Sequence, residues 1–363
     1  MTTMKEIAER AGVSISAVSL VLNNHEGGRV APETADKIRA LAQKLKYKPN
    51  LLARSLQANQ THLLGFISED VATTPYAGRL ILGAQDAADA YGYALLCANV
   101  DSDDSDHRDP ANDEDGEGLR EDTARTMDIF YQYGVDGFLY AKMSNRTFGA
   151  PDSSGRPMVL VDCADREHKV PSIEPDEFLI GYDATRRLIQ AGCSSIAYLG
   201  FPEPIIAQVR RRAGYLQALK EEGIPYDPHL DVMVGDNYAA QKTVDDLFAH
   251  AHPDGFFCFN DARAFHVYLA AARRGLVVGR DISVVGVDNH RMFAQTLAPR
   301  LTTVELPHYE MGYWAVGRLV QELEGRSIDL DQKDSWARMP SLDTPSPARI
   351  HCRLIEKESV RHE

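Results

Sequence analysis

Acidic and amide side chains stand directly after several apolar segments that read as strands. Asp162 ends the stretch VLVDC, Asn260 and Asp261 follow GFFCF, and Asp288 ends VVGVD. Ligands of parallel sheets bind outside the carboxyl ends of the strands, so these side chains are expected at a ligand cleft. A carboxylate accepts hydrogen bonds from two hydroxyl groups, which suits a polyhydroxylated ligand. Each residue could instead cap a following turn or helix, and Asp261 is expected to do so.

The sequence carries no pattern typical of a catalytic site. It lacks the G-x-S-x-G elbow, the phosphate-binding loop of nucleotide hydrolases and the dinucleotide-binding G-x-G-x-x-G. No metal ligands cluster, and the five cysteines are widely spaced without a C-x-x-C pair, so they are expected to be reduced and structural. None of the scattered histidines pairs with a candidate nucleophile: His107, His168, His229, His250 and His290. We expect no enzyme activity, no metal and no cofactor.

From residue 61 onward, apolar strands alternate with amphipathic helices. The expected strands cover 63–67, 93–100, 136–141, 158–163, 195–200, 231–235, 255–260 and 282–288. The expected helices include 76–91, 122–133, 207–222 and 261–274. Near-continuous apolar strands separated by helices predict an α/β fold with parallel sheets covered on both faces.

Eight strands are more than we expect in a single sheet of this kind, so we predict two lobes that divide near residues 163–165. The segment 301–324 is expected to return to the first lobe. The expected boundaries are about 62–163 and 301–330 for lobe 1, and about 164–300 and 331–363 for lobe 2.

Composition indicates a soluble globular protein, with 44% hydrophobic and 25% charged residues. No apolar run approaches the roughly 20 residues that span a bilayer. The amino-terminal segment lacks the apolar core of a signal peptide, so a cytoplasmic location is expected.

The net charge of −14 is divided unevenly. Residues 1–60 hold nine Lys/Arg and five Asp/Glu, a balance of +4, which leaves −18 for the remainder. A basic head on an acidic body is the asymmetry expected when one end of a protein contacts phosphates.

Two segments read as irregular. Residues 101–122 hold eleven acidic residues against two arginines. This stretch lacks the full spacing of a calcium-binding loop, so a solvated, partly disordered insertion is the preferred interpretation. Residues 328–347 are rich in Pro, Ser and Asp and read as a loop.

The first residues of the chain read as two short helices joined by a tight turn. Thr3 followed by Glu6 is a capping-box signature that starts a helix, and Gly12 breaks it because glycine tolerates turn angles. Ser14 is a candidate N-cap for a second helix over 15–22. This pattern predicts a helix-turn-helix, whose second helix lies in the major groove of DNA. A small helical hairpin without a role in DNA binding is the alternative.

A third helix is expected from about 32 to 45, with an apolar stripe that includes Ile38 and Ala42. Pro49 ends it, because the residue before proline avoids the helical region. A short capped segment begins at Asn50. We therefore expect a helix-turn-helix domain over 1–48, a hinge over 49–61, and a third domain over 62–363.

Four stretches follow one another in a specific order and spacing: ERAGVS, SLVLN, YKPN and ARSL. They resemble the DNA-binding head and hinge of the lactose-repressor/galactose-repressor (LacI/GalR) family of transcriptional regulators, and the resemblance continues along the chain. It implies a homodimer on a pseudo-palindromic operator in double-stranded DNA. It also implies an effector-binding and dimerisation domain like a two-lobed periplasmic sugar-binding protein.

The resemblance implies that the start of the second helix reads DNA bases. The expected base readers are Ile15, Ser16 and Ala17. Apolar side chains suit thymine methyl groups, and a serine hydroxyl can donate or accept a hydrogen bond. Phosphate contacts are expected from Ser14, Ser19 and Asn23.

Leu20 departs from the family pattern, because many members carry a guanine-contacting arginine at that position. Loss of such a contact removes about 1–3 kcal/mol of discrimination, so the operator should differ from the usual family site. Arg29 is a candidate replacement contact.

The resemblance also assigns a minor-groove role to the hinge, through Asn50, Ala53 and Leu56. Leu56 would insert between base steps together with the Leu56 of a second subunit and kink the duplex. Alternatively, Leu56 packs under its own domain.

For the effector, the resemblance adds Arg211, which precedes Ala213-Gly214-Tyr215, and Tyr76, an aromatic position that packs on a sugar face. The expected effector-binding set is Tyr76, Asp162, Arg211, Asn260 and Asp288.

The sequence thus predicts a transcriptional repressor of carbohydrate-utilisation genes, controlled by a sugar or sugar derivative bound between two lobes. A corepressor-dependent regulator or an activator of the same fold is an alternative. A cytoplasmic sugar-binding protein is another, which the DNA-binding head argues against.

Overall fold

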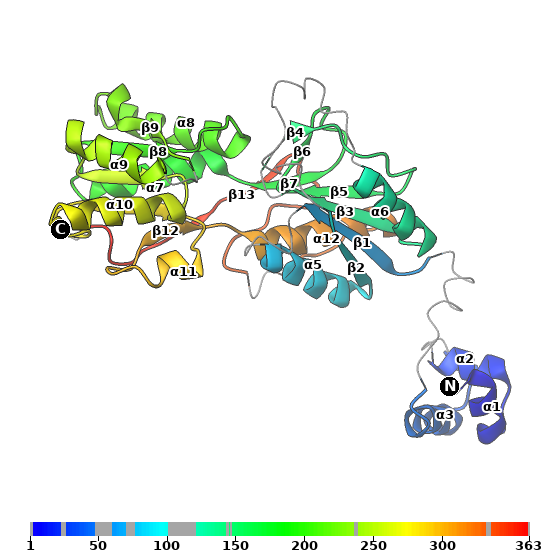
Figure 1. The fold of residues 1–363 in the computed structure, drawn as a ribbon. Coiled ribbons are helices and arrows are strands. Elements are labelled where there is room, and N and C mark those ends of the chain that lie inside the picture. Colours follow the sequence, from blue (N-terminus) through cyan, green and yellow to red (C-terminus); the bar gives the residue numbers. More distant parts are fainter. Residues whose placement is uncertain are drawn as a thin grey trace. The chain divides into compact units, whose positions relative to one another are not determined.

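The computed structural model describes residues 3–22, 27–47, 60–69, 77–100, 121–142, 145, 147–235, 239–331 and 335–361. The chain forms two compact units, Met1–Thr61 and His62–Glu363. Figure 1 shows helices in the first unit and an assembly of sheets and helices in the second. Within the described ranges, no helix combines the length and apolar character needed to cross a lipid bilayer.

The described residues of the first unit form a helical head built from α1 (Met4–Ala11), α2 (Ile15–Leu22) and α3 (Pro32–Lys44). Its core is small and consists mainly of aliphatic side chains from all three helices: Ile7, Ala8, Ala11, Val18, Val21, Ala35, Ile38 and Ala42. The predicted helix-turn-helix is confirmed, because α1 and α2 are joined by three residues and pack against α3.

The local signals that set the head's helices act as the sequence predicts. Thr3 caps α1 by accepting a hydrogen bond from the Glu6 amide at 3.2 Å. Gly12 ends α1 in the left-handed region, with φ of 76°. The Ser14 hydroxyl accepts from the Ala17 amide at 3.1 Å, so Ser14 caps α2. An N-cap of this kind stabilises a helix by about 1 kcal/mol.

The first lobe of the second unit contains a parallel sheet in the order β13-β7-β5-β3-β1-β2. Its strands are β1 (Leu63–Glu69), β2 (Ala94–Val100), β3 (Gly137–Ala141), β5 (Met158–Val161), β7 (Ser172–Pro175) and β13 (Ala348–Ile350). The helices of this lobe are α5 (Ala77–Tyr91), α6 (Glu121–Gln132) and α12 (His308–Glu324). A two-stranded ribbon, β4 (Thr147–Phe148) with β6 (Ala164–Asp165), accompanies them.

Both faces of this sheet are buried, which explains the unbroken apolar strands. Along β3, Phe138 and Tyr140 pack in the core that includes Met127 and Phe130 of α6. Leu139 points the other way, into the core that α5 and α12 cover. Successive side chains of a strand alternate between faces, so a strand covered on both sides must be apolar throughout.

The second lobe contains a sheet in the order β14-β12-β11-β10-β8-β9, with only β14 antiparallel. Its strands are β8 (Ile196–Gly200), β9 (Asp231–Met233), β10 (Gly255–Cys258), β11 (Ser283–Val287), β12 (Thr302–Glu305) and β14 (Arg353–Ile355). Helices α7 (Glu177–Gln190) and α8 (Ile206–Glu221) cover one face. Helices α9 (Ala239–His250) and α10 (Asp261–Arg273) cover the other, and α11 (Arg291–Ala294) and the 3-10 turn η2 (Pro228–Leu230) complete the lobe. The predicted α/β fold with two covered parallel sheets is confirmed.

The lobe boundaries differ from the predicted ones. β7 pairs with β5 in the first sheet, so the chain leaves that lobe after residue 175 rather than near 163–165. Of the segment 301–324, β12 pairs with β11 in the second sheet and α12 returns to the first lobe. The terminal segment divides between β13 in the first sheet and β14 in the second. Strand pairing, rather than the order of elements along the chain, determines these boundaries.

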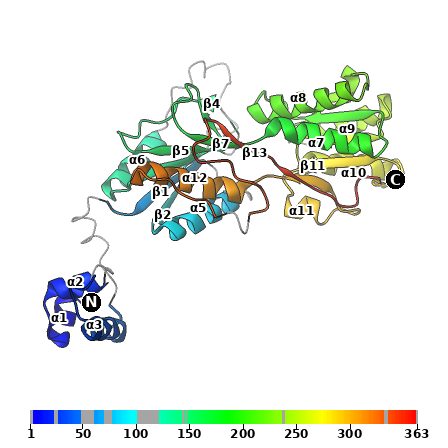
Figure 2. The same cartoon turned by 180° about the vertical axis from the view of Figure 1, so that it is seen from behind.

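Each lobe contains a helix pair whose backbones touch, α5 with α12 and α7 with α8. A Cβ added to Gly83 would lie 1.9 Å from the carbonyl oxygen of Tyr309, and one on Gly181 would lie 1.9 Å from that of Arg211. The side chains of larger residues would therefore force each pair apart. Figure 2 shows α7 and α8 side by side in the second lobe, as they are in Figure 1.

All five cysteines are free thiols. Cys163, Cys193, Cys258 and Cys352 are buried as the prediction requires, whereas Cys97 is exposed on β2. The predicted loop over 328–347 contains no helix or strand in its described residues. The acidic stretch 101–122 lies outside the described residues except for its last two positions, which begin α6.

Candidate functional site

The start of α2 presents an exposed surface on the head. Val18 and Val21 are buried in the head's core, so the opposite side of the helix faces outward. Ser14, Ile15 and Ser16 are exposed, and the side chain of Ile15 remains 50% exposed although it is apolar. A large exposed aliphatic residue in a small domain is a contact candidate, and its chemistry suits the methyl group of thymine.

Other predicted DNA contacts have less exposed or undescribed positions. Ala17 and Ser19 are half-buried, as is Leu20, the position that lacks the family's arginine, and Arg29 is exposed in the turn before α3. Asn23, Asn50, Ala53 and Leu56 lie outside the described residues, so their roles stay predictions.

In the second unit, the predicted strand-end residues lie where expected along the chain. Asp162 directly follows β5 and Asp288 directly follows β11, and both have positive φ, 55° and 105°. Such angles are unfavourable for residues with a Cβ and persist where the surrounding structure imposes them. Tyr76 lies outside the described residues.

The prediction that Asp261 caps α10 is wrong. Asn260, not Asp261, caps α10, because its Oδ1 accepts from the Arg263 amide at 3.1 Å. Asp261 is fully buried and accepts from the Thr303 hydroxyl and the His290 amide, each at 2.6 Å. The Oδ1 of Asn260 also accepts from Nη1 of Arg263 at 3.0 Å, so only its amide nitrogen is left for an effector.

Arg211 lies on α8, and its guanidinium is paired with Glu177, the first residue of α7. The Nε and Nη2 atoms donate to the two carboxylate oxygens, at 2.5 and 3.2 Å. Nη1 donates to the carbonyl oxygen of Phe259 at 2.7 Å, and the guanidinium carbon lies 4.5 Å from the centre of the Phe259 ring. The side chains of Arg211 and Glu177 are 4% and 2% exposed.

The strand ends of the two lobes are electrostatically coupled at this point. Burial raises the pKa of Asp162 well above its usual value, and the charges of Glu177 and Glu174 raise it further while Arg211 lowers it. Burial lowers the pKa of Arg211, but the charge and hydrogen bonds of Glu177 outweigh it, so the net shift is upward. Asp288 acts on both groups. Charged residues from both lobes therefore form one polar cluster, in which Asp162 and Arg211 are buried and Asp288 is half-buried. Their role in effector binding stays a prediction.

Four members of this cluster have no signal in the sequence. Glu177 is identified only by its ion pair with Arg211 in the structure. Asn145 donates a hydrogen bond to Glu177 at 3.4 Å. Glu174 on β7 accepts from Arg210 and Arg349, at 2.5 and 2.9 Å. His308 begins α12, and burial, helped by the charges of Arg79 and Arg211, lowers its pKa to about 3. Their partners are distant in sequence, so no spacing indicates them.

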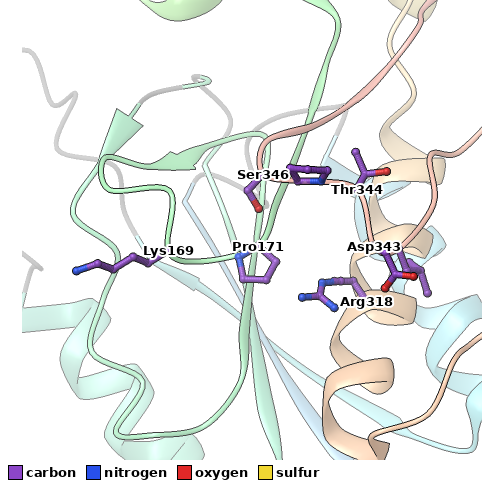
Figure 3. A pocket seen from close by; sticks show the side chains of 8 residues that line it. Lys169, Pro171, Arg318, Asp343, Thr344 and Ser346 are labelled. Atoms are coloured by element: carbon purple, nitrogen blue, oxygen red, sulfur yellow. The ribbon is translucent and has the colours of Figure 1, made fainter.

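A separate pocket of roughly 300 Å³ lies in the first lobe and contains none of the predicted effector residues. Its lining is Lys169, Pro171, Arg318, Leu342, Asp343, Thr344, Pro345 and Ser346. Figure 3 shows the Lys169 side chain extending away from Arg318, so the two cations do not converge on one ligand position. Asp343 also lines the pocket on the side of Arg318.

A helix-turn-helix head followed by a two-lobed α/β unit with buried polar residues at its strand ends defines a class of DNA-binding regulators. Residues 3–50 match the family described as bacterial regulatory proteins, lacI family, and residues 185–335 match the periplasmic binding protein-like domain. The chain belongs to the lacI family.

Two relatives illustrate the similarity along the chain. The ribose operon repressor of Escherichia coli (strain K12) is 30% identical over 331 residues, which cover 89% of this chain and 93% of that protein. The sucrose operon repressor of Escherichia coli is 29% identical over 337 residues, covering 90% and 96%.

Among solved structures, a LacI-family transcriptional regulator protein from Rhizobium etli matches 83% of this chain and 99% of its own, with 25% identity and a TM-score of 0.67. The lac repressor dimer bound to operator and the anti-inducer ONPF matches 99% of both chains, with a TM-score of 0.70. At 20% identity this second match concerns the fold alone.

Proposed function

We propose that this chain is a homodimeric transcriptional repressor of carbohydrate-utilisation genes, and that a sugar or sugar derivative sets its affinity for operator DNA. One observation carries the proposal: a head with the exposed side chains Ile15 and Ser16 is joined to a two-lobed unit with carboxyl groups at its strand ends. The names of the relatives, which repress sucrose and ribose operons, support a carbohydrate effector.

On the DNA side, the start of α2 reads bases in the major groove. Ile15 contacts thymine methyl groups, and Ser16 exchanges hydrogen bonds with base edges. Ser14 and Ser19 hold phosphates and so set the register of the helix on the duplex. Because Leu20 supplies no guanidinium, guanine recognition at that position is absent, and Arg29 is the candidate that replaces it.

On the effector side, the ligand binds between the lobes, near Asp162, Arg211 and Asp288. The lobes are linked by three chain crossings: 175–177, 305–308 and 350–353. We propose that the lobes adopt two arrangements relative to each other, one with high and one with low affinity for DNA. A ligand that contacts both lobes favours one of these arrangements. It changes DNA affinity only as far as its own affinity differs between these two arrangements.

The test is selection from random duplex DNA with the purified full chain at one fixed, moderate salt concentration, because DNA affinity depends steeply on salt. We expect enrichment of one pseudo-palindromic sequence, and loss of that enrichment when the cognate sugar is added. Ile15→Ala should change the preferred sequence at the base it contacts. The matched control is Glu9→Ala, an exposed position on α1, which should leave the preference unchanged.

The alternatives give different results. Enrichment that appears only when a sugar is present would identify a corepressor-dependent regulator. No enrichment in either condition would contradict the proposal. For Arg29, a uniform fall in affinity for all sequences upon Arg29→Ala would make it a phosphate contact, whereas a changed base preference would make it a reader.

A further inference from the structure

The guanidinium of Arg211 is occupied along one of the two edges through which an arginine can hold an anion. Arginine binds carboxylates and phosphates through two parallel N–H donors. In this chain those donors, Nε and Nη2, already hold the carboxylate of Glu177. Glu177 therefore takes one of the two edges through which this guanidinium could hold an anion, and its charge neutralises the guanidinium. Nη1, which contributes to the other edge, donates to the Phe259 carbonyl oxygen.

The packing of α7 against α8 keeps this pair together. A Cβ on Gly214 would lie 2.1 Å from the carbonyl oxygen of Phe178, just as one on Gly181 would meet the backbone of Arg211. Because the two helix backbones are in contact, α7 and α8 cannot move apart without disrupting the buried core between them. An anionic ligand would therefore either displace Glu177 and leave that carboxylate buried without its partner, or bind beside it and bury two like charges together. Both are strongly unfavourable.

The groups left over at the cluster suit hydroxyls. Among the described residues, Glu177 and Phe259 accept from three of the five N–H donors of Arg211. Two donors therefore remain for a ligand. Asp162 is only 6% exposed, and its raised pKa favours the protonated form, which both donates and accepts. The other buried guanidinium, Arg263, is held by the Val234 carbonyl oxygen at 2.8 Å and by Asn260 at 3.0 Å.

We infer that Glu177 is a specificity-determining residue: by occupying one anion-binding edge of Arg211 and neutralising its charge, it restricts the effector to uncharged polyhydroxylated molecules and excludes phosphorylated or acidic sugars. This inference rests on the proposed function, since it names the chemical class of the ligand at the same site.

Glu177→Gln is the variant that isolates this effect. Glutamine has nearly the same size, but its amide offers Arg211 one acceptor oxygen in place of two. It therefore leaves one N–H donor without its acceptor and the guanidinium charge without its counter-charge. A buried cation without a partner favours an incoming anion. We expect the variant to bind inorganic phosphate at least about tenfold more tightly than the wild-type chain, a change of about 1.4 kcal/mol.

The experiment is calorimetric titration of the full chain with three probes: inorganic phosphate, glucose 6-phosphate and a panel of uncharged mono- and disaccharides. The wild-type chain should bind neither anionic probe. Glu177→Gln should bind phosphate, and the double variant Glu177→Gln/Arg211→Met should lose that binding. The matched control is Glu358→Gln, which removes a carboxylate from an exposed pair with Arg300 and should behave as wild type.

The possible failures are distinguishable. Saturable binding of either anion by the wild-type chain, at a site lost in Arg211→Met, would overturn the inference and leave a small-molecule regulator in place. A folded Glu177→Gln chain that gains no phosphate affinity would overturn it as well. Phosphate binding gained by Glu177→Gln, without binding of any uncharged sugar by wild type, would support anion exclusion and contradict the carbohydrate part of the proposed function. The wild-type titrations remain decisive even if Glu177→Gln does not fold.

Discussion

Replacing Arg211 by methionine should destabilise the second unit by about 3–5 kcal/mol. Methionine fills a similar volume but carries no charge, so it leaves the carboxylate of Glu177 buried at 2% exposure without its ion partner. Breaking a buried pair from one side costs this much because the remaining charge is uncompensated. The Phe259 carbonyl oxygen also loses the donor that lies 2.7 Å away.

The double variant Arg211→Met/Glu177→Leu tests whether the uncompensated charge is the cause. With both charges removed, the helix interface becomes apolar, and stability should return to within about 2 kcal/mol of wild type. The coupling energy between the two positions should therefore be at least about 1 kcal/mol, near the range of residues in direct contact.

The assay is urea unfolding followed by far-UV circular dichroism, at one protein concentration because association alters apparent stability. Tryptophan fluorescence should be recorded in parallel. Both tryptophans, Trp314 and Trp336, pack in or against the core of the first lobe, so a fluorescence transition that differs from the dichroism transition would show the lobes unfolding separately. A loss below about 1 kcal/mol for Arg211→Met, or additive effects in the double variant, would refute the buried-pair reasoning.

Three further predictions concern the helices and one buried histidine. Ser14→Ala removes the cap of α2, so the Ala17 amide should exchange with deuterium faster, consistent with a loss of about 1 kcal/mol. Gly214→Ala places a Cβ against the Phe178 carbonyl oxygen, so the urea midpoint should fall by an amount equivalent to about 1–3 kcal/mol. His308 should make the protein about 1.4 kcal/mol less stable at pH 5.5 than at pH 7.5. Below its unfolded pKa of 6.5 only the unfolded state takes up the proton, because burial lowers the folded pKa to about 3.

Each of these has a control and a contradicting result. Gly78→Ala adds a Cβ with nothing within 4 Å, so it should leave the urea midpoint nearly unchanged. His308→Gln should flatten the pH dependence, whereas the exposed His229→Gln should not. The first prediction is contradicted if the Ala17 amide exchanges at the same rate with and without the Ser14 hydroxyl. The second is contradicted if Gly214→Ala leaves the urea midpoint unchanged, and the third if His308→Gln and wild type show the same dependence of stability on pH.

The head could be predicted closely because its signals are local. A capping hydroxyl, a left-handed glycine and a second cap act within three or four residues, so their spacing in sequence equals their spacing in the structure. The same holds for the strands, because burial on both faces leaves an unbroken apolar segment that is recognisable without knowing its neighbours.

Local patterns could not predict the boundaries of the lobes or all members of the polar cluster around Arg211. β7 follows the predicted division between lobes, yet it pairs with β5 and extends the first sheet. Either Asn260 or Asp261 could cap α10. The choice depends on Thr303 and the His290 amide, which occupy the Asp261 carboxylate from other elements.

The sequence by itself determined the class of this protein: the helix-turn-helix, the alternating strands and helices, and the strand-end carboxyl groups all follow from local patterns. Only the tertiary structure decided which residue pairs with the guanidinium of Arg211. Its partner Glu177 lies 34 residues away on another helix, and their pairing requires α7 and α8 to meet backbone to backbone at glycines. Charge pairing in a buried cluster depends on which elements pack together, and the periodicity of the sequence does not indicate that packing.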